Sequence, residues 1–75
     1  MNITTNGDAV SIDPLTVQEY LLSLGIDPRR VAVELNLEIL PKAQYETTDL
    51  AEGDTLEIVQ FVGGGSLPAS LPKAG

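Results

Sequence analysis

Apolar and polar residues alternate along the first segment of the chain, MNITTNGDAVSID (residues 1–13). The apolar positions of this alternation are Met1, Ile3, Val10 and Ile12. A period of two is typical of half-buried strands. Asn6-Gly7 lies between the two halves, and Asn-Gly favours a tight turn because both central residues of that turn need a positive φ. The segment therefore predicts a β-hairpin.

The period changes to that of a helix in PLTVQEYLLSLGIDP (residues 14–28). Its apolar stripe consists of Val17, Tyr20, Leu21 and Leu24. Thr16 and Glu19 have the spacing of a capping box, which satisfies two free N–H groups at a helix start. Gly25 stands where a helix often ends in a residue with positive φ, and Pro28 prevents a restart. We expect one helix that buries Leu21 and Leu24 against a sheet.

A second hairpin is predicted by VAVELNLEILP (residues 31–41). Val31, Val33 and Leu35 alternate with less apolar residues, and Ile39 belongs to the returning strand. Pro41 ends that strand because it cannot donate a ladder hydrogen bond. The turn near Asn36-Leu37 lacks the usual turn residues, so its register stays open.

The last strand is predicted from Thr55 to Val62, after a tight turn at Gly53-Asp54. A short irregular or single-turn piece, residues 42–46, and a lone apolar plug, Leu50, precede it. The strand has apolar residues on both faces, which suits a central position in a sheet. If Leu56 and Ile58 face the helix, Val59 and Phe61 face outward.

The predicted order is strand, strand, helix, strand, strand, turn, strand. This order indicates an α+β roll of the β-grasp (ubiquitin-like) type, with a mixed four- to five-stranded sheet and one main helix. We expect a β-grasp domain over residues 1–62, a flexible glycine tail over 63–65 and a C-terminal extension over 66–75. That extension is rich in Pro, Ala and Ser and is expected to be disordered, because it cannot bury enough surface to order itself.

Size and composition restrict the chemistry. A domain of 75 residues needs nearly all its large apolar side chains for a core. Little is left to line a separate substrate cavity, so an enzyme is the weakest of the functional interpretations. Neither Cys nor His is present, which removes the usual zinc ligands and nucleophile–base pairs. The acidic residues Glu46, Asp49, Glu52 and Asp54 do not have calcium-loop spacing. We expect no metal site and no catalytic residue.

The chain is acidic, with a formal net charge of −7 from 11 acidic and 4 basic residues. Such a charge disfavours nucleic acid as a partner. It reflects either solubility alone or a face that docks on a basic protein. Arg29-Arg30 is too small a basic patch for nucleic acid, and we expect it to cap the helix end or to contact solvent. No signal peptide or membrane-spanning run is recognised, so a soluble, cytoplasmic protein is expected.

Three consecutive glycines, Gly63-Gly64-Gly65, follow the last strand directly. Glycine loses more backbone entropy on ordering than any other residue, so this tripeptide specifies a thin and flexible segment. As a bare linker the signal is weak, but no second domain follows it in FVGGGSLPASLPKAG.

The segment EGDTLEIVQFVGGG, with the T-x-x-E helix start and VAVELNLEILPKAQY, resembles the ThiS family, the sulfur-carrier proteins of thiamine biosynthesis. The likeness covers residues 1–65. It implies that a terminal glycine carboxylate, on Gly65 or less favourably Gly64, is adenylated and then converted to a thiocarboxylate. Members of the family end at these glycines, whereas this chain continues to residue 75.

The resemblance also implies the partners. An E1-like adenylating enzyme would use the ATP, which the carrier itself does not bind as a cofactor. A persulfide protein would donate the sulfur, and thiazole synthase would receive it. Residues 63–65 would thread into the partners' sites. Val59 with Phe61 would form a docking face. Alternatively, Phe61 lies buried under a loop and does not contact a partner.

Several readings stay open from the sequence alone. The carrier could serve another pathway, such as molybdopterin, cysteine or another thioacid, or the chain could be a ubiquitin-like interaction module with no carrier role. Residues 66–75 could be removed by a processing protease, persist as an extension or be a remnant of cloning. We expect their removal, because adenylation at Gly65 needs a free carboxylate there.

Overall fold

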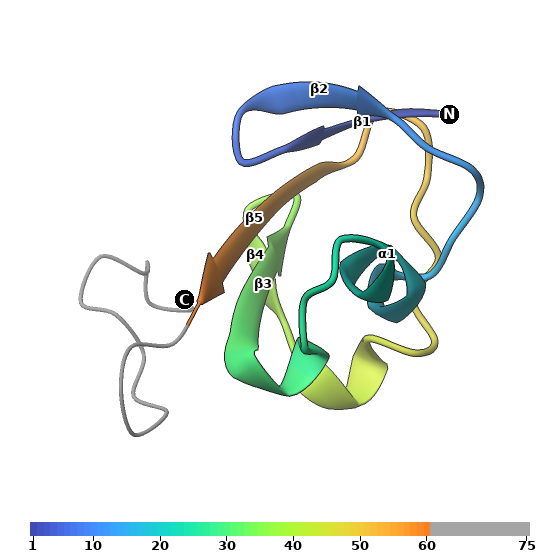
Figure 1. Ribbon diagram of the computed structural model, residues 1–75. Coiled ribbons are helices and arrows are strands. Elements are labelled where there is room, and N and C mark those ends of the chain that lie inside the picture. Colours follow the sequence, from blue (N-terminus) through green and yellow to red (C-terminus); the bar gives the residue numbers. More distant parts are fainter. Residues whose placement is uncertain (61–75) are drawn as a thin grey trace.

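The computed structural model describes residues 1–60, which form a five-stranded mixed sheet and one main helix (Figure 1). The strand order across the sheet is β2-β1-β5-β3-β4. The central strand β5 (Thr55–Gln60) runs parallel to β1 (Asn2–Thr5) and antiparallel to β3 (Val31–Leu35). The predicted α+β roll, with its last strand in the centre of the sheet, is confirmed.

The first hairpin joins β1 to β2 (Asp8–Ser11) in antiparallel register, with Ile3 opposite Val10. Its turn residues Asn6 and Gly7 have φ values of 49° and 85°. This left-handed conformation is the one that Asn and Gly tolerate best. The hairpin predicted from Asn6-Gly7 is therefore confirmed.

Helix α1 (Val17–Ser23) begins at the predicted capping box. The backbone N–H of Glu19 donates to Thr16 Oγ1 at 3.1 Å, and the backbone N–H of Thr16 donates to Glu19 Oε1 at 2.9 Å. Val17, Tyr20 and Leu21 are buried against the sheet. The hydroxyl of Tyr20 also lies 2.8 Å from Thr5 Oγ1 on β1, which ties the helix to the sheet.

The prediction that Leu24 is buried is wrong, because its side chain is 49% exposed. The helix ends at Ser23, and Leu24 is its C-cap residue. The Ile26 N–H donates to Leu21 O, and the Gly25 N–H donates to Leu22 O, in a Schellman motif. This motif turns the chain so that Ile26, instead of Leu24, packs against the core.

The second hairpin joins β3 to β4 (Glu38–Leu40), with Leu35 opposite Glu38. Asn36 and Leu37 form its turn and have φ values of 52° and 72°. A leucine in the left-handed region is uncommon and costs conformational energy. Leu37 is also 87% exposed, so no burial of its side chain offsets that cost.

Two short 3-10 helices connect the remaining elements: η1 (Pro28–Arg30) precedes β3, and η2 (Lys42–Gln44) follows β4. The single turn expected within residues 42–46 corresponds to η2. Tyr45, directly after it, is only 1% exposed, and its hydroxyl donates to Val31 O at 3.2 Å. Leu50 is buried as predicted.

The core lies between α1 and one face of the sheet (Figure 1). Its fully buried side chains include Val17 and Leu21 of the helix and Val33 and Leu56 of the sheet. Ile58 packs against this core from β5, as predicted. Residues of β3 and β5 that alternate with these, including Val59, therefore belong to the opposite face of the sheet.

Candidate functional site

The predicted site consists of the end of β5 and the residues that follow it. Val59 is the one member of this site that the structure describes. It pairs with Ala32 of β3, is half-buried and lies on the sheet face turned away from α1, as the sequence predicted. Phe61 and residues 63–65 lie outside the described residues, so their roles stay predictions.

Strand β5 is held on both sides almost to its last residue. On the β3 side the pairing runs from Leu56, opposite Leu35, to Gln60, opposite Val31. On the β1 side the last backbone bond runs from the Asn6 N–H to Leu56 O at 2.9 Å, and the side chain of Asn6 extends the pairing beyond it. Asn6 Oδ1 accepts from the Ile58 N–H at 2.7 Å, and Asn6 Nδ2 donates to Ile58 O at 3.2 Å. The last described residues of β5 are thus firmly paired.

Basic residues gather near Gln60, the last described residue of β5. Gln60 pairs with Val31, the residue that directly follows Arg29 and Arg30 of η1. Lys42 of η2 donates from Nζ to Arg29 O at 2.6 Å. All three basic residues of the described part of this acidic chain therefore lie near one end of β5.

Asp27 organises this group. Its carboxylate accepts from Arg29 Nε at 3.1 Å and from Arg29 Nη2 at 3.0 Å, and its Oδ1 also caps η1 through the Arg29 N–H at 2.9 Å. These side-chain and backbone bonds lower the pKa of Asp27 to about 2. The side chains of Arg29 and Arg30 are 88% and 84% exposed. Of the two roles expected for them, contact with solvent is the one observed, and neither caps α1.

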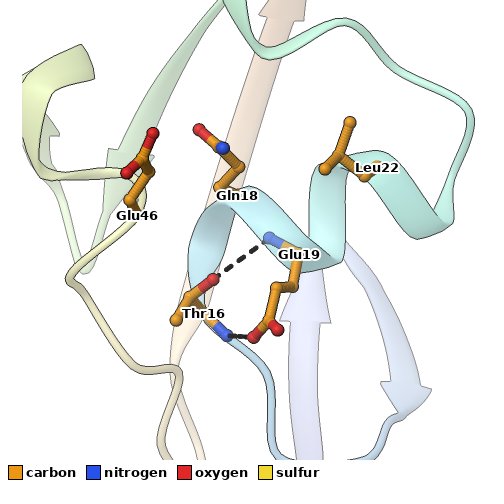
Figure 2. A pocket seen from close by; sticks show the side chains of 5 residues that line it. All are labelled: Thr16, Gln18, Glu19, Leu22 and Glu46. Carbon is orange, nitrogen blue, oxygen red and sulfur yellow. Dashed lines mark hydrogen bonds between the residues drawn. The ribbon is translucent and has the colours of Figure 1, made fainter.

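A hollow beside α1 is lined by Thr16, Gln18, Glu19, Leu22 and Glu46 (Figure 2). Thr16 and Glu19 are occupied by the capping box that starts the helix. The lining offers neither a thiol nor an imidazole. The hollow therefore has the features of a structural surface depression.

Two of the four clustered acidic residues, Glu52 and Asp54, have structural roles. Glu52 Oε1 accepts from the Asn2 N–H at 3.0 Å, and Asp54 Oδ2 accepts from the Ala51 N–H at 2.8 Å. Asp54 Oδ1 also accepts from Asn36 Nδ2 at 2.9 Å. Over residues 1–60, no group of three or more His, Cys, Asp or Glu side chains is arranged to hold a metal ion.

No helix within residues 1–60 is long and apolar enough to cross a membrane.

Comparison with known families decides the identity of the fold. The model of the ThiS family matches residues 3–65, which include all of the sheet but its first residue, the helix and the three glycines. The chain belongs to the ThiS family. The match ends at Gly65, the position at which the sequence resemblance placed the reacting carboxylate.

Curated relatives agree with membership of the ThiS family. The sulfur carrier protein ThiS of Bacillus subtilis is 43% identical over 53 residues, which are 71% of this chain and 80% of that protein. Thiazole synthase of Paramagnetospirillum magneticum is 48% identical over 67 residues, which are 88% of this chain. The chain spans only 21% of the length of that relative, and likewise 21% of a thiazole synthase of Magnetococcus marinus.

Solved structures of a family member show the same fold. The crystal structure of ThiS from Geobacter metallireducens has a TM-score of 0.75 and 37% identity, and the match covers 85% of this chain and 99% of that one. Its solution structure has a TM-score of 0.72 at 35% identity. The predicted membership of the ThiS family and the predicted β-grasp fold are therefore confirmed.

One feature of the ThiS-family surface was missed in the sequence. Glu34 and Glu57 stand directly opposite each other on neighbouring strands, on the same sheet face as Val59. The alternation in VAVEL and TLEIV places each glutamate on the face opposite the core, but only the register of β3 with β5 brings them together.

Proposed function

We propose that this carrier holds sulfur as a thiocarboxylate on Gly65 after removal of residues 66–75. The observation that carries the proposal is the family match, which ends at the third glycine, close behind the firmly paired strand β5. The chain supplies the reacting group and a docking face, and its partners supply the catalysis. We propose the cytoplasm as the compartment, because the adenylating step uses ATP as a co-substrate.

The first step would be attack of the Gly65 carboxylate on the α-phosphorus of ATP, with release of pyrophosphate. The adenylating partner would catalyse it. The terminal sulfur of a persulfide protein would then attack the same carbonyl and displace AMP, and a thiol would reduce the resulting acyl disulfide, which leaves the thiocarboxylate on Gly65 and a disulfide on the donor side. Three extended residues reach roughly 10 Å. A tail without Cβ atoms can pass through a narrow channel, which suits Gly63, Gly64 and Gly65 to entry into more than one partner.

Thiazole synthase is the acceptor that we propose. Two relatives of that name contain a segment similar to this chain within a much longer polypeptide. A carrier-like segment in one chain with the enzyme supports a functional association between them. Val59, half-buried on the open sheet face, would contribute to docking, and Phe61 would anchor the partner. Phe61→Ala should then weaken binding by about 2 kcal/mol or more, the range of an interface hot spot.

The test compares three chains that end at Gly75, Gly65 and Gly64. Each is incubated with ATP and the adenylating enzyme of the same organism, and release of pyrophosphate and the mass of the chain are measured. We expect an adenylate on the chain that ends at Gly65, little on the one that ends at Gly64 and none on the full chain. Equal adenylation of the full chain at Gly75 would contradict the proposal.

A further inference from the structure

Two carboxylates face each other across the open side of the sheet. Glu34 of β3 is the direct partner of Glu57 of β5 in the antiparallel ladder. Among residues 1–60, neither side chain has a hydrogen bond or an ion pair. Like charges directly opposite each other in a sheet are destabilising. The fold therefore carries this acidic pair at a cost.

Glu34 is also buried to a degree that is rare for a carboxylate. Only 7% of its surface is exposed, whereas Glu57 is exposed. A buried charge is costly unless it is paired. Since no fully buried polar atom among the described side chains lacks a partner, the oxygens of Glu34 still reach solvent while its stem is covered. They can thus be contacted from outside.

Apolar residues flank the pair on two sides, and the polar Thr55 precedes Glu57 on the same face of β5. Ile39 of β4 lies opposite Glu34 on its other side. Ala32 and Val59 form the next cross-strand pair on the same face toward the end of β5, and both are at least half-buried. An acidic centre with apolar neighbours has the layout of a protein interface in which one charge pair is desolvated by apolar contacts.

We infer that Glu34 and Glu57 together receive one arginine guanidinium of a protein partner of the carrier. Ala32, Ile39 and Val59 would contact apolar side chains around that arginine. A guanidinium presents several donors in a planar fork and can bond two carboxylates at once, whereas an ammonium is a point charge. The inference rests on the proposed function, since the partner is a protein that takes up the carrier's tail.

Charge argues against a second copy of this chain as the occupant. The chain has a net charge of −7, and two such faces would place four carboxylates against one another. A basic partner is attracted by the same charge, which speeds its association with the carrier and favours it over acidic proteins.

The variants Glu34→Gln and Glu57→Gln keep the shape of each side chain and remove its charge. Glu46→Gln is the matched control, because Glu46 is exposed and lines the hollow beside α1 (Figure 2). Glu34 and Glu57 lie instead on the sheet face turned away from the core. Binding of the chain that ends at Gly65 to the adenylating enzyme and to thiazole synthase is measured by calorimetry at low and high NaCl concentration. Thermal unfolding of the free variants is recorded in parallel.

We expect each of the two variants to weaken binding to at least one enzyme by about tenfold or more, and the control to leave it unchanged. The difference should shrink at high salt. At the same time each variant should melt about 1–5 °C higher than the unaltered chain, because the repulsion is relieved. A structural role for the pair predicts the opposite, a lower melting temperature with unchanged affinity.

Unchanged binding of both variants to both enzymes would overturn the inference and leave the proposed function standing. Absence of any binding by the unaltered chain to either enzyme would overturn both.

Discussion

The side chain of Asn6 bonds both the backbone N–H and the backbone C=O of Ile58, at 2.7 and 3.2 Å. Asn6 itself lies in the first turn with a positive φ. One asparagine thus closes the hairpin and continues the ladder along β5 where the backbone of β1 has turned away. Asn36 has a similar role on the other side, since its Oδ1 accepts from the Thr55 N–H at 3.0 Å.

Asn6→Gly separates these two functions. Glycine keeps the left-handed backbone without strain, but both bonds to Ile58 are lost. We expect a loss of about 1–2 kcal/mol in the free energy of unfolding, measured by urea denaturation. Amide exchange of Ile58 should accelerate more than that of Val33, which β4 and β5 still flank. An unchanged exchange rate at Ile58 would show that the side chain of Asn6 does not hold the strand.

The helix stripe offers a matched pair of leucines. Leu21 is fully buried and Leu24 is half-exposed beyond the helix end. Leu21→Ala should lower the free energy of unfolding by about 2–5 kcal/mol, because it leaves a cavity in the core. Leu24→Ala should cost less than about 1 kcal/mol. Comparable losses in chemical denaturation would contradict the burial described for α1.

Leu37 should be replaceable with a gain in stability. It has a φ of 72° and an almost fully exposed side chain. Leu37→Gly relieves the left-handed strain and should stabilise the chain by about 0.5–1 kcal/mol. The same change at Leu22, an exposed position inside α1, should destabilise it by about 1 kcal/mol. Destabilisation by Leu37→Gly in thermal melts would mean that the leucine side chain packs in this turn.

Acid should release the ion pair between Asp27 and Arg29. The bonds from Arg29 hold the pKa of Asp27 at about 2, below the usual value of 3.8. Since the folded-state pKa is lowered, the pair stabilises the fold above about pH 3.8 and that contribution disappears as the pH falls through about 2.

The carboxyl carbon of Asp27, followed by NMR during acid titration, should have its midpoint near pH 2. In Arg29→Gln the midpoint should move toward 3.8, though not fully, because the backbone N–H at position 29 still donates to the carboxylate. Arg30→Gln is the control: its Nε lies 3.8 Å from Asp27 Oδ2, so the midpoint should move less. A normal midpoint in the unaltered chain would contradict the pairing.

Local signals in the sequence predicted most of the fold. The Asn6-Gly7 turn, the capping box of Thr16 and Glu19 and the end of α1 at Gly25 each depend on residues close in the chain. The last strand was placed in the centre because it is apolar on both faces. These features follow from backbone and hydrogen-bonding rules that act over a few residues.

The one error concerns the local geometry of a helix end, and the two omissions concern contacts between distant segments. Leu24 fits the helical period, but the Schellman motif puts Ile26 in its place. Tyr45 lies in what the sequence shows as an irregular piece, yet its hydroxyl bonds Val31 O inside the core. The pair of Glu34 with Glu57 depends on strand register, which no local pattern fixes.

Where the sulfur is attached can be read directly from the mass of the chain. The full chain and the chain that ends at Gly65 are each incubated with ATP, the adenylating enzyme, a persulfide protein and a thiol reductant, and their fragments are then weighed by tandem mass spectrometry. We expect one oxygen of the terminal carboxylate to be replaced by sulfur on the chain that ends at Gly65, and no sulfur on the full chain. Sulfur at Gly75 of the full chain, or a chain ending at Gly65 that never acquires sulfur, would contradict the assignment of Gly65 as the carrier residue.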